Sequence, residues 1–129
     1  MQTMNEINLA DVVAEVTQEF LRYQKAVDAN DVQTMNTLFW DSPHTVRFAY
    51  NGTLVGYASI AQYRQARANQ TIERRLRNTV ITTFGRGFAV TNTEVVRPDR
   101  DVVSRQSQAW IKTDDGWKIA AAHVSDQPV

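Results

Sequence analysis

The order of two hydrophobic periodicities along the chain most limits its fold. Between residues 8 and 28, apolar residues recur at helical spacing and form one stripe. From residue 76 onward, four strand-like runs follow one another, separated by turn-forming residues. Helices in one part of a chain and antiparallel strands in another are typical of an α+β layer architecture, not of alternating βαβ units. The stripe consists of Leu9, Val12, Val13, Val16, Phe20, Tyr23 and Val27.

The helical part contains three predicted helices and one hairpin. Asn8 is a candidate N-cap for the first helix, and Asp31 for a short second helix through Leu38. Asn51-Gly52 is a favoured two-residue type I′ turn, which would join a strand at Thr45–Tyr50 to a return strand at Thr53–Val55. A third helix is expected over Ser59–Asn69. The four later strands are predicted at Leu76–Phe84, Phe88–Arg97, Val102–Lys112 and Trp117–Ser125.

Length and composition exclude several classes of protein. The chain has 129 residues, which favours a single domain over residues 1–129. The 14 basic residues balance the 14 acidic ones, so we expect no nucleic-acid partner and no membrane partner. Cysteine is absent, which removes disulfides, thiolate nucleophiles and cysteine-ligated metals. With neither a run of about 20 apolar residues nor a signal-like N-terminus, the sequence indicates a cytoplasmic protein.

The positive charge is supplied mostly by arginine. Eleven of the 14 basic residues are arginine, the side chain best suited to a bidentate grip on carboxylates. Ten of these lie within residues 46–105, whereas residues 1–45 are mostly acidic. The asymmetry fits either a self-complementary assembly surface or ordinary solvated faces. The bias toward arginine also suggests a small carboxylate-bearing ligand.

Tyr23 and Arg47 form the first candidate site. A curved sheet around the first helix would enclose a pocket and bring Tyr23 close to the sheet. Strand alternation places Arg47 on the face opposite Val46 and Phe48. A guanidinium beside Tyr23 would favour the phenolate and make the hydroxyl a proton-transfer group. Arg47 could at the same time hold a substrate carboxylate.

Polar residues inside the later strands are weaker candidates. Ser104, Gln106 and Gln108 share a face with Trp110, while Ser107 takes the other face. Such a mixed face fits a ligand cavity or a wet dimer interface equally well. His123 is expected on the face of Trp117, Ile119 and Ala121, where a satisfied core histidine is the commoner outcome. No phosphate-binding loop, nucleophile elbow or pair of metal-spaced histidines is present.

Four segments resemble a known family. The run LFWDSPHTVRF at residues 38–48 is similar to the hallmark segment of the AtzH-like family, which includes proteins encoded with oxalurate-catabolism genes. RNTVITTFGR at 77–86, RQSQAW at 105–110 and GWKIAAAHVS at 116–125 fit the same pattern. The resemblance runs from about residue 13 to residue 125. It implies the SnoaL-like, ketosteroid-isomerase-like (nuclear transport factor 2-like) superfamily, a cone-shaped cystatin-like α+β fold.

The resemblance also implies a function and a set of site residues. The activity characterised in the family is a decarboxylating hydrolysis of 1,3-dicarboxyurea, so a hydrolase of a small ureido acid is expected, without a metal or another cofactor. The proposed catalytic tyrosine and arginine of the family match Tyr23 and Arg47. The substrate-binding candidates in matching segments are Trp40, His44, Gln106, Ser107 and His123.

Two other functions stay open at the level of sequence. One is a non-catalytic ligand-binding or accessory subunit of a neighbouring amidase. The other is isomerase or dehydratase chemistry, which needs a pocket carboxylate or histidine, such as Glu94, Asp41, His44 or His123. A homodimer through one face of the sheet is expected as well. The candidate residues for that face are Val80, Val95, Ile111 and Val124.

Overall fold

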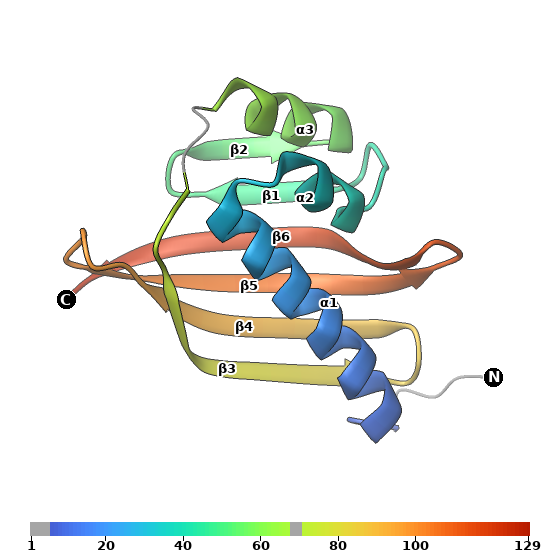
Figure 1. Ribbon diagram of the computed structural model, residues 1–129. Helices are drawn as coiled ribbons and strands as arrows, with labels where there is room; N and C mark the ends of the chain where they lie inside the picture. The colour runs from blue at the N-terminus through green and yellow to red at the C-terminus, as the bar shows by residue number, and fades with distance from the viewer. Residues whose placement is uncertain (1–5, 68–70) are drawn as a thin grey trace.

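Three helices pack on one six-stranded sheet in the computed structural model, which describes residues 6–67 and 71–129. The helices are α1 (Ala10–Ala29), α2 (Val32–Leu38) and α3 (Tyr57–Ala66). Figure 1 shows α1 lying diagonally across one face of the sheet, with α2 and α3 gathered over β1 and β2. The predicted α+β architecture, with helices on a strongly curved sheet, is therefore confirmed. The strands are β1 (Val46–Ala49), β2 (Gly52–Val55), β3 (Arg75–Phe84), β4 (Phe88–Val96), β5 (Val102–Thr113) and β6 (Gly116–Pro128).

The strands follow the order β2-β1-β6-β5-β4-β3. The neighbours from β3 to β6 pair antiparallel, as expected for consecutive strands joined by short turns. The short strand β1 pairs with β6 in parallel, through Arg47 beside Ala122 and Phe48 beside His123. This one parallel pair departs from the expected all-antiparallel sheet. It brings the hallmark segment next to the C-terminal strand.

The core lies between the inner face of the sheet and the apolar stripe of α1. Val12, Val16 and Phe20 are at most 2% exposed, and burial of side chains of this size stabilises a fold by about 1.5 to 3 kcal/mol each. Trp110, on the inner face of β5, is fully buried. Its indole N–H donates to the Thr91 hydroxyl at 3.0 Å, so the polar atom of the ring is satisfied.

Of the two predicted helix caps, one is confirmed and the other is wrong. Asp31 caps α2 as expected, because its carboxylate accepts from the backbone N–H of Thr34 at 3.2 Å. Asn8 does not cap α1, whose N-cap residue is Leu9. Instead, the Asn8 side-chain oxygen accepts from the backbone N–H of Thr83 at 2.9 Å, and its own N–H donates to the Thr83 carbonyl. Asn8 thus ties the start of the helix to the far edge strand, β3.

The hairpin and the third helix also differ in detail from expectation. β1 and β2 do pair as a hairpin, with Ala49 opposite Gly52. The two loop residues are Tyr50 and Asn51, and neither has a positive φ, so the predicted type I′ turn is wrong. α3 begins at Tyr57, two residues before the predicted start. Its predicted end, Asn69, lies outside the described residues.

A bulge in β6 reverses the expected placement of His123. Ala109 pairs with Ala121, but Trp110 pairs with Ile119, so Ala120 is an extra residue in β6. Beyond the bulge, Ala122 is buried on the inner face while Ala121 and His123 are exposed on the outer one. The expectation that His123 shares the face of Trp117 and Ile119 is therefore wrong.

No helix in the described part of the chain is long and apolar enough to cross a membrane.

Candidate functional site

An arginine-rich cavity of about 170 Å³ lies between the helices and the inner face of the sheet. Its wall comes from the three helices, β1, the inner faces of β4 to β6, and the connecting segments near them. Parts of the chain far apart in sequence therefore meet there. The lining includes one carboxylate, Asp126, and six arginines: Arg47, Arg64, Arg67, Arg74, Arg97 and Arg100.

Three of these arginines are neutralised by carboxylates. Arg74 pairs with Asp28 at 2.6 Å, Arg97 with Asp99 at 2.7 Å, and Arg100 with Asp126 at 2.6 Å. The other three, Arg47, Arg64 and Arg67, have no carboxylate partner among the described residues. The positive charge of the cavity is thus only partly balanced by the protein. A concave site with an excess of one charge attracts ligands of the opposite sign.

Both carboxylate oxygens of Asp126 are used in hydrogen bonds within the protein. Its carboxylate accepts from the Ser104 hydroxyl at 2.7 Å and from the Arg100 guanidinium at 2.6 Å. The Ser104 hydrogen bond and the Arg100 guanidinium lower the pKa of this carboxyl below its usual value. At neutral pH Asp126 is therefore ionised and already hydrogen-bonded. It has neither the raised pKa nor the free oxygen of a general acid.

Tyr23 and Arg47 both border the cavity, the first from α1 and the second from β1. Tyr23, on α1, is 6% exposed, and its ring lies 5.7 Å from that of Phe39. In the described chain its hydroxyl has no hydrogen-bond partner. Arg47, on β1, places its guanidinium 5.2 Å from the centre of the Tyr63 ring, a cation–π distance. The fold therefore brings the two predicted catalytic side chains to one cavity, although no hydrogen bond between them is present.

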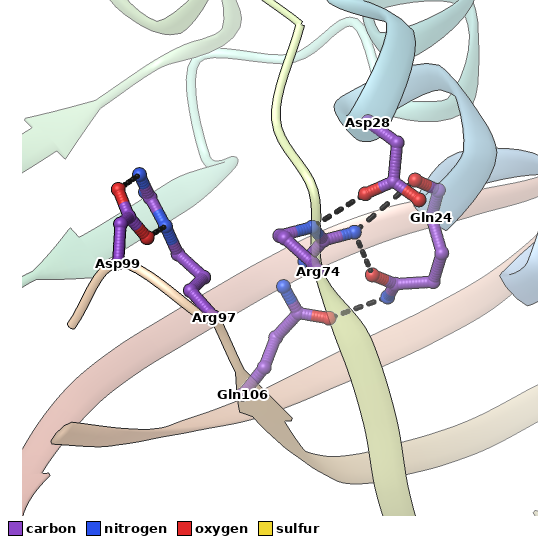
Figure 2. A network of polar contacts seen from close by, with 6 residues as sticks. All are labelled: Gln24, Asp28, Arg74, Arg97, Asp99 and Gln106. Carbon is purple, nitrogen blue, oxygen red and sulfur yellow. Dashed lines mark hydrogen bonds and ion pairs between the residues drawn. The ribbon is translucent and has the colours of Figure 1, made fainter. Parts of the chain in front are cut away.

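Gln106 also borders the cavity. A chain of hydrogen bonds from Arg74 through Gln24 fixes the orientation of its side-chain amide (Figure 2). Arg74 can only donate, and its Nη2 donates to Gln24 Oε1 at 2.9 Å. Because Oε1 of Gln24 accepts this bond, the orientation of the Gln24 amide is fixed, and its Nε2 donates to Gln106 Oε1 at 2.5 Å. The Gln106 Nε2 is left without a partner among the described residues. The network thus leaves a hydrogen-bond donor, not an acceptor, on Gln106 at the cavity.

The other four sequence candidates lie elsewhere. Ser107 and His123 are exposed on the outer face of the sheet, in a shallow depression with Phe48. Trp40 and His44 lie beyond the end of α2, with ring centres 6.4 Å apart, and neither borders the arginine-rich cavity. The expectation of one pocket lined by all seven candidates is not met. A ligand-binding role for these four residues stays a prediction.

Sequence reasoning missed one buried cation, Arg64. Only 5% of the residue is exposed, its guanidinium lies 4.2 Å from the centre of the Phe39 ring, and its Nη1 donates to Asn36 Oδ1 at 3.0 Å. The spacing from Ile60, one helical turn earlier on the buried face, is the signal that could have found it. The described residues contain no cluster of three or more side chains suited to holding a metal ion.

Comparisons with known proteins agree with this picture of the fold. A crystal structure of a protein of unknown function from the DUF3225 family of Pectobacterium atrosepticum is 43% identical, with a TM-score of 0.93; the match covers 98% of this chain and 99% of that one. A cystatin-like fold protein from Burkholderia xenovorans is 39% identical, with a TM-score of 0.92 and coverage of 96% and 98%. A nuclear transport factor 2-like protein from Salmonella enterica is 28% identical, with a TM-score of 0.71 and 93% of both chains covered.

A search of curated proteins found no match. The family model described as AtzH-like, in contrast, matches residues 5–128, almost the whole chain. The match includes every element that forms the arginine-rich cavity, from α1 to β6. The chain belongs to the AtzH-like family.

Proposed function

We propose that the protein is a decarboxylating amidohydrolase that acts on a small carboxylated urea. The observation that carries this proposal is the arginine-rich cavity, in which three guanidinium groups have no carboxylate partner in the described chain. A ligand with one or more carboxylates would supply the missing negative charge, and arginine holds carboxylates through two parallel hydrogen bonds. Membership of the AtzH-like family supports a substrate such as 1,3-dicarboxyurea.

Arg47 and Tyr23 have separate roles in this mechanism. Arg47 holds a carboxylate that stays on the substrate and fixes its position in the cavity. Loss of carbon dioxide breaks the bond between nitrogen and the departing carboxylate, and leaves the electron pair on nitrogen. Tyr23, whose hydroxyl is unpaired in the described chain, donates a proton to that nitrogen. In the hydrolytic step, water attacks the urea carbonyl carbon and gives one proton to the resulting Tyr23 phenolate. Tyr23 passes this proton to the amino nitrogen, the carbon–nitrogen bond breaks and ammonia leaves, and the proton of the newly formed carboxylic acid restores the Tyr23 hydroxyl.

Ammonia release from 1,3-dicarboxyurea, allophanate and oxalurate tests the proposal. We expect turnover of at least one of them by the wild type. Tyr23→Phe should lower kcat by about 10²-fold or more, because proton transfer by a positioned side chain contributes about 10²- to 10⁴-fold. Arg47→Ala should act mainly on KM. Tyr57→Phe and Arg105→Ala, which remove a hydroxyl and a guanidinium outside the cavity, are the matched controls.

Two results would contradict this function. One is a wild-type protein that releases no ammonia from any of the three compounds. The other is turnover that survives in both Tyr23→Phe and Arg47→Ala at the wild-type rate. Parallel loss of activity in the two control variants would show that the effects are structural.

A second candidate is a subunit that binds the same ligand without turning it over. The observation in its favour is that the described residues of the lining include no histidine and a single carboxylate, Asp126, which is held by Ser104 and Arg100. Co-purification with a neighbouring amidase, or a change in the rate of that amidase on mixing, would support this reading. Isomerase chemistry has less support, because it needs a carboxyl group with a raised pKa, and the pKa of Asp126 is lowered.

A further inference from the structure

Arg64 has a free donor atom that the rest of the protein does not explain. Its Nη2 is buried and has no hydrogen-bond partner among the described residues, although Arg64 borders the cavity. Its other contacts, Asn36 at Nη1 and the Phe39 ring, offer no negative charge. Buried guanidinium groups in proteins are nearly always paired with an anion, because burial of an unpaired charge is costly. A charged partner for Arg64 is therefore missing among the described residues.

The three unpaired arginines lie against two different aromatic rings. Arg64 lies over Phe39, whose other neighbour is the ring of Tyr23. Arg47 and Arg67 both lie beside Tyr63, at 5.2 and 5.8 Å from its ring centre. The burial of these side chains also differs, since Arg64 is buried, Arg47 is half-buried and Arg67 is exposed. The cavity thus has an inner cationic position and an outer one.

We propose that Arg64 is a second anion-binding position, so that the ligand carries an anionic group at each of two ends. The inner carboxylate meets Arg64 close to Tyr23, and the outer one meets Arg47. This inference rests on the proposed function in taking the cavity as the ligand site and carboxylate as the anion. It adds a residue outside the candidate pair, and it predicts that a monocarboxylate fills the site only in part.

Titration of the intact protein with malonate, oxalurate and acetate tests this proposal without requiring turnover. Malonate offers two carboxylates, oxalurate a carboxylate and a ureido group, and acetate one carboxylate. We expect the wild type to bind malonate at least tenfold more tightly than acetate by calorimetry. Arg64→Lys keeps the charge but removes the planar fork, and should lower malonate affinity at least tenfold while acetate affinity changes less.

Asn36→Asp provides an isosteric variant for the case in which Arg64→Lys does not fold. It places a carboxylate against Nη1 of Arg64, so the guanidinium gains an internal partner and its attraction for a ligand anion is reduced. Malonate affinity should again fall at least tenfold, with the melting temperature unchanged or raised. Asn92→Asp, the same substitution at an exposed position on the outer face of the sheet, should leave both properties as in the wild type.

Several outcomes would overturn the two-position proposal. The first is that the wild type binds neither malonate nor oxalurate. The second is that the wild type binds malonate and acetate with equal affinity. The third is that Asn36→Asp binds malonate as tightly as the wild type does. Other results would contradict the proposed enzyme function without contradicting the second anion-binding position, and the reverse. Malonate binding that depends on Arg64 without any ammonia release would uphold the second position and contradict the hydrolase, whereas ammonia release with an unchanged KM in Asn36→Asp would do the reverse.

Discussion

Arginine side chains in the cavity differ by their partners, and this difference assigns their roles. Arg74, Arg97 and Arg100 are each paired with an aspartate and serve the fold. Arg47 and Arg64 have no such partner in the described chain, and we assign them to the ligand. Sequence composition alone cannot separate the two groups, because the partner of a buried arginine is set by contacts between distant segments. Asn36, for example, lies 28 positions before Arg64.

The Asp126 carboxylate should make stability depend on pH in the acid range. Its pKa in the folded state lies below the value in the unfolded chain, because of Ser104 and Arg100. The contribution of Asp126 to the free energy of unfolding is therefore fully present above the pKa of the unfolded chain, near 3.8. This contribution is lost as the pH falls through the pKa of the folded state. At pH 7, Asp126→Asn should lower the free energy of unfolding by about 1 to 2 kcal/mol, allowing for the partial exposure of Arg100.

Urea denaturation at pH 7 and at pH 3 measures this effect. The gap between Asp126→Asn and wild type should shrink at the lower pH. Asp114→Asn, in the exposed turn between β5 and β6, is the matched control and should unfold like the wild type. A gap that stays constant or widens toward pH 3 would show that Asp126 acts through packing and not through its charge.

Between elements, the hydrogen-bonded chain that joins α1, Arg74 and β5 positions one donor for the ligand. Gln106→Leu removes the Nε2 that faces the cavity, and should weaken malonate binding about three- to tenfold, the worth of one hydrogen bond. Gln24→Leu should give part of this loss, because Gln106 then loses the contact that orients its amide. Calorimetric titration of each variant provides the measurement.

Ser107→Ala is the matched control for Gln106→Leu. Ser107 is the next residue along β5 and points to the outer face, where its hydroxyl donates to Asn92. Its removal should leave malonate affinity unchanged. Weaker binding in Ser107→Ala than in Gln106→Leu would place the ligand on the outer face instead of in the cavity.

Most of the helices and strands could be predicted from sequence, but the face of the sheet on which particular side chains lie could not. Hydrophobic periodicity is a local property, and it located the stripe of α1 and the alternation that turns Arg47 and Gln106 inward. The bulge at Ala120 depends on how β6 pairs with β5, so His123 was expected on the wrong face. Asn8 likewise suits two local roles, and contact with the distant strand β3 decides between them.

For the whole molecule, the outer face of the sheet is the surface on which we predict a homodimer. Phe48 and Val80 are 45% and 56% exposed there, and Ile111 lies on the same face, opposite Phe88. Two of the residues expected on this surface lie elsewhere, because Val95 and Val124 border the cavity. A two-fold pairing of outer faces would remove the exposed apolar side chains from water.

Light scattering at micromolar concentration should therefore give about twice the chain mass of 14.7 kDa. Phe48→Glu places a charge on this face and should shift the protein to the monomer. Leu21→Glu, a similar change at an exposed position on α1, should leave the dimer intact. A wild-type monomer, or equal dissociation by both substitutions, would contradict an interface on the outer face.

The central claim is that the arginine-rich cavity holds a ligand with two anionic groups. A crystal structure of the protein bound to malonate tests it most directly. We predict density for malonate inside the cavity, with one carboxylate within hydrogen-bond distance of Arg64 and the other within reach of Arg47. Malonate bound on the outer face beside His123, or at Trp40 and His44 with the cavity unoccupied, would contradict the account.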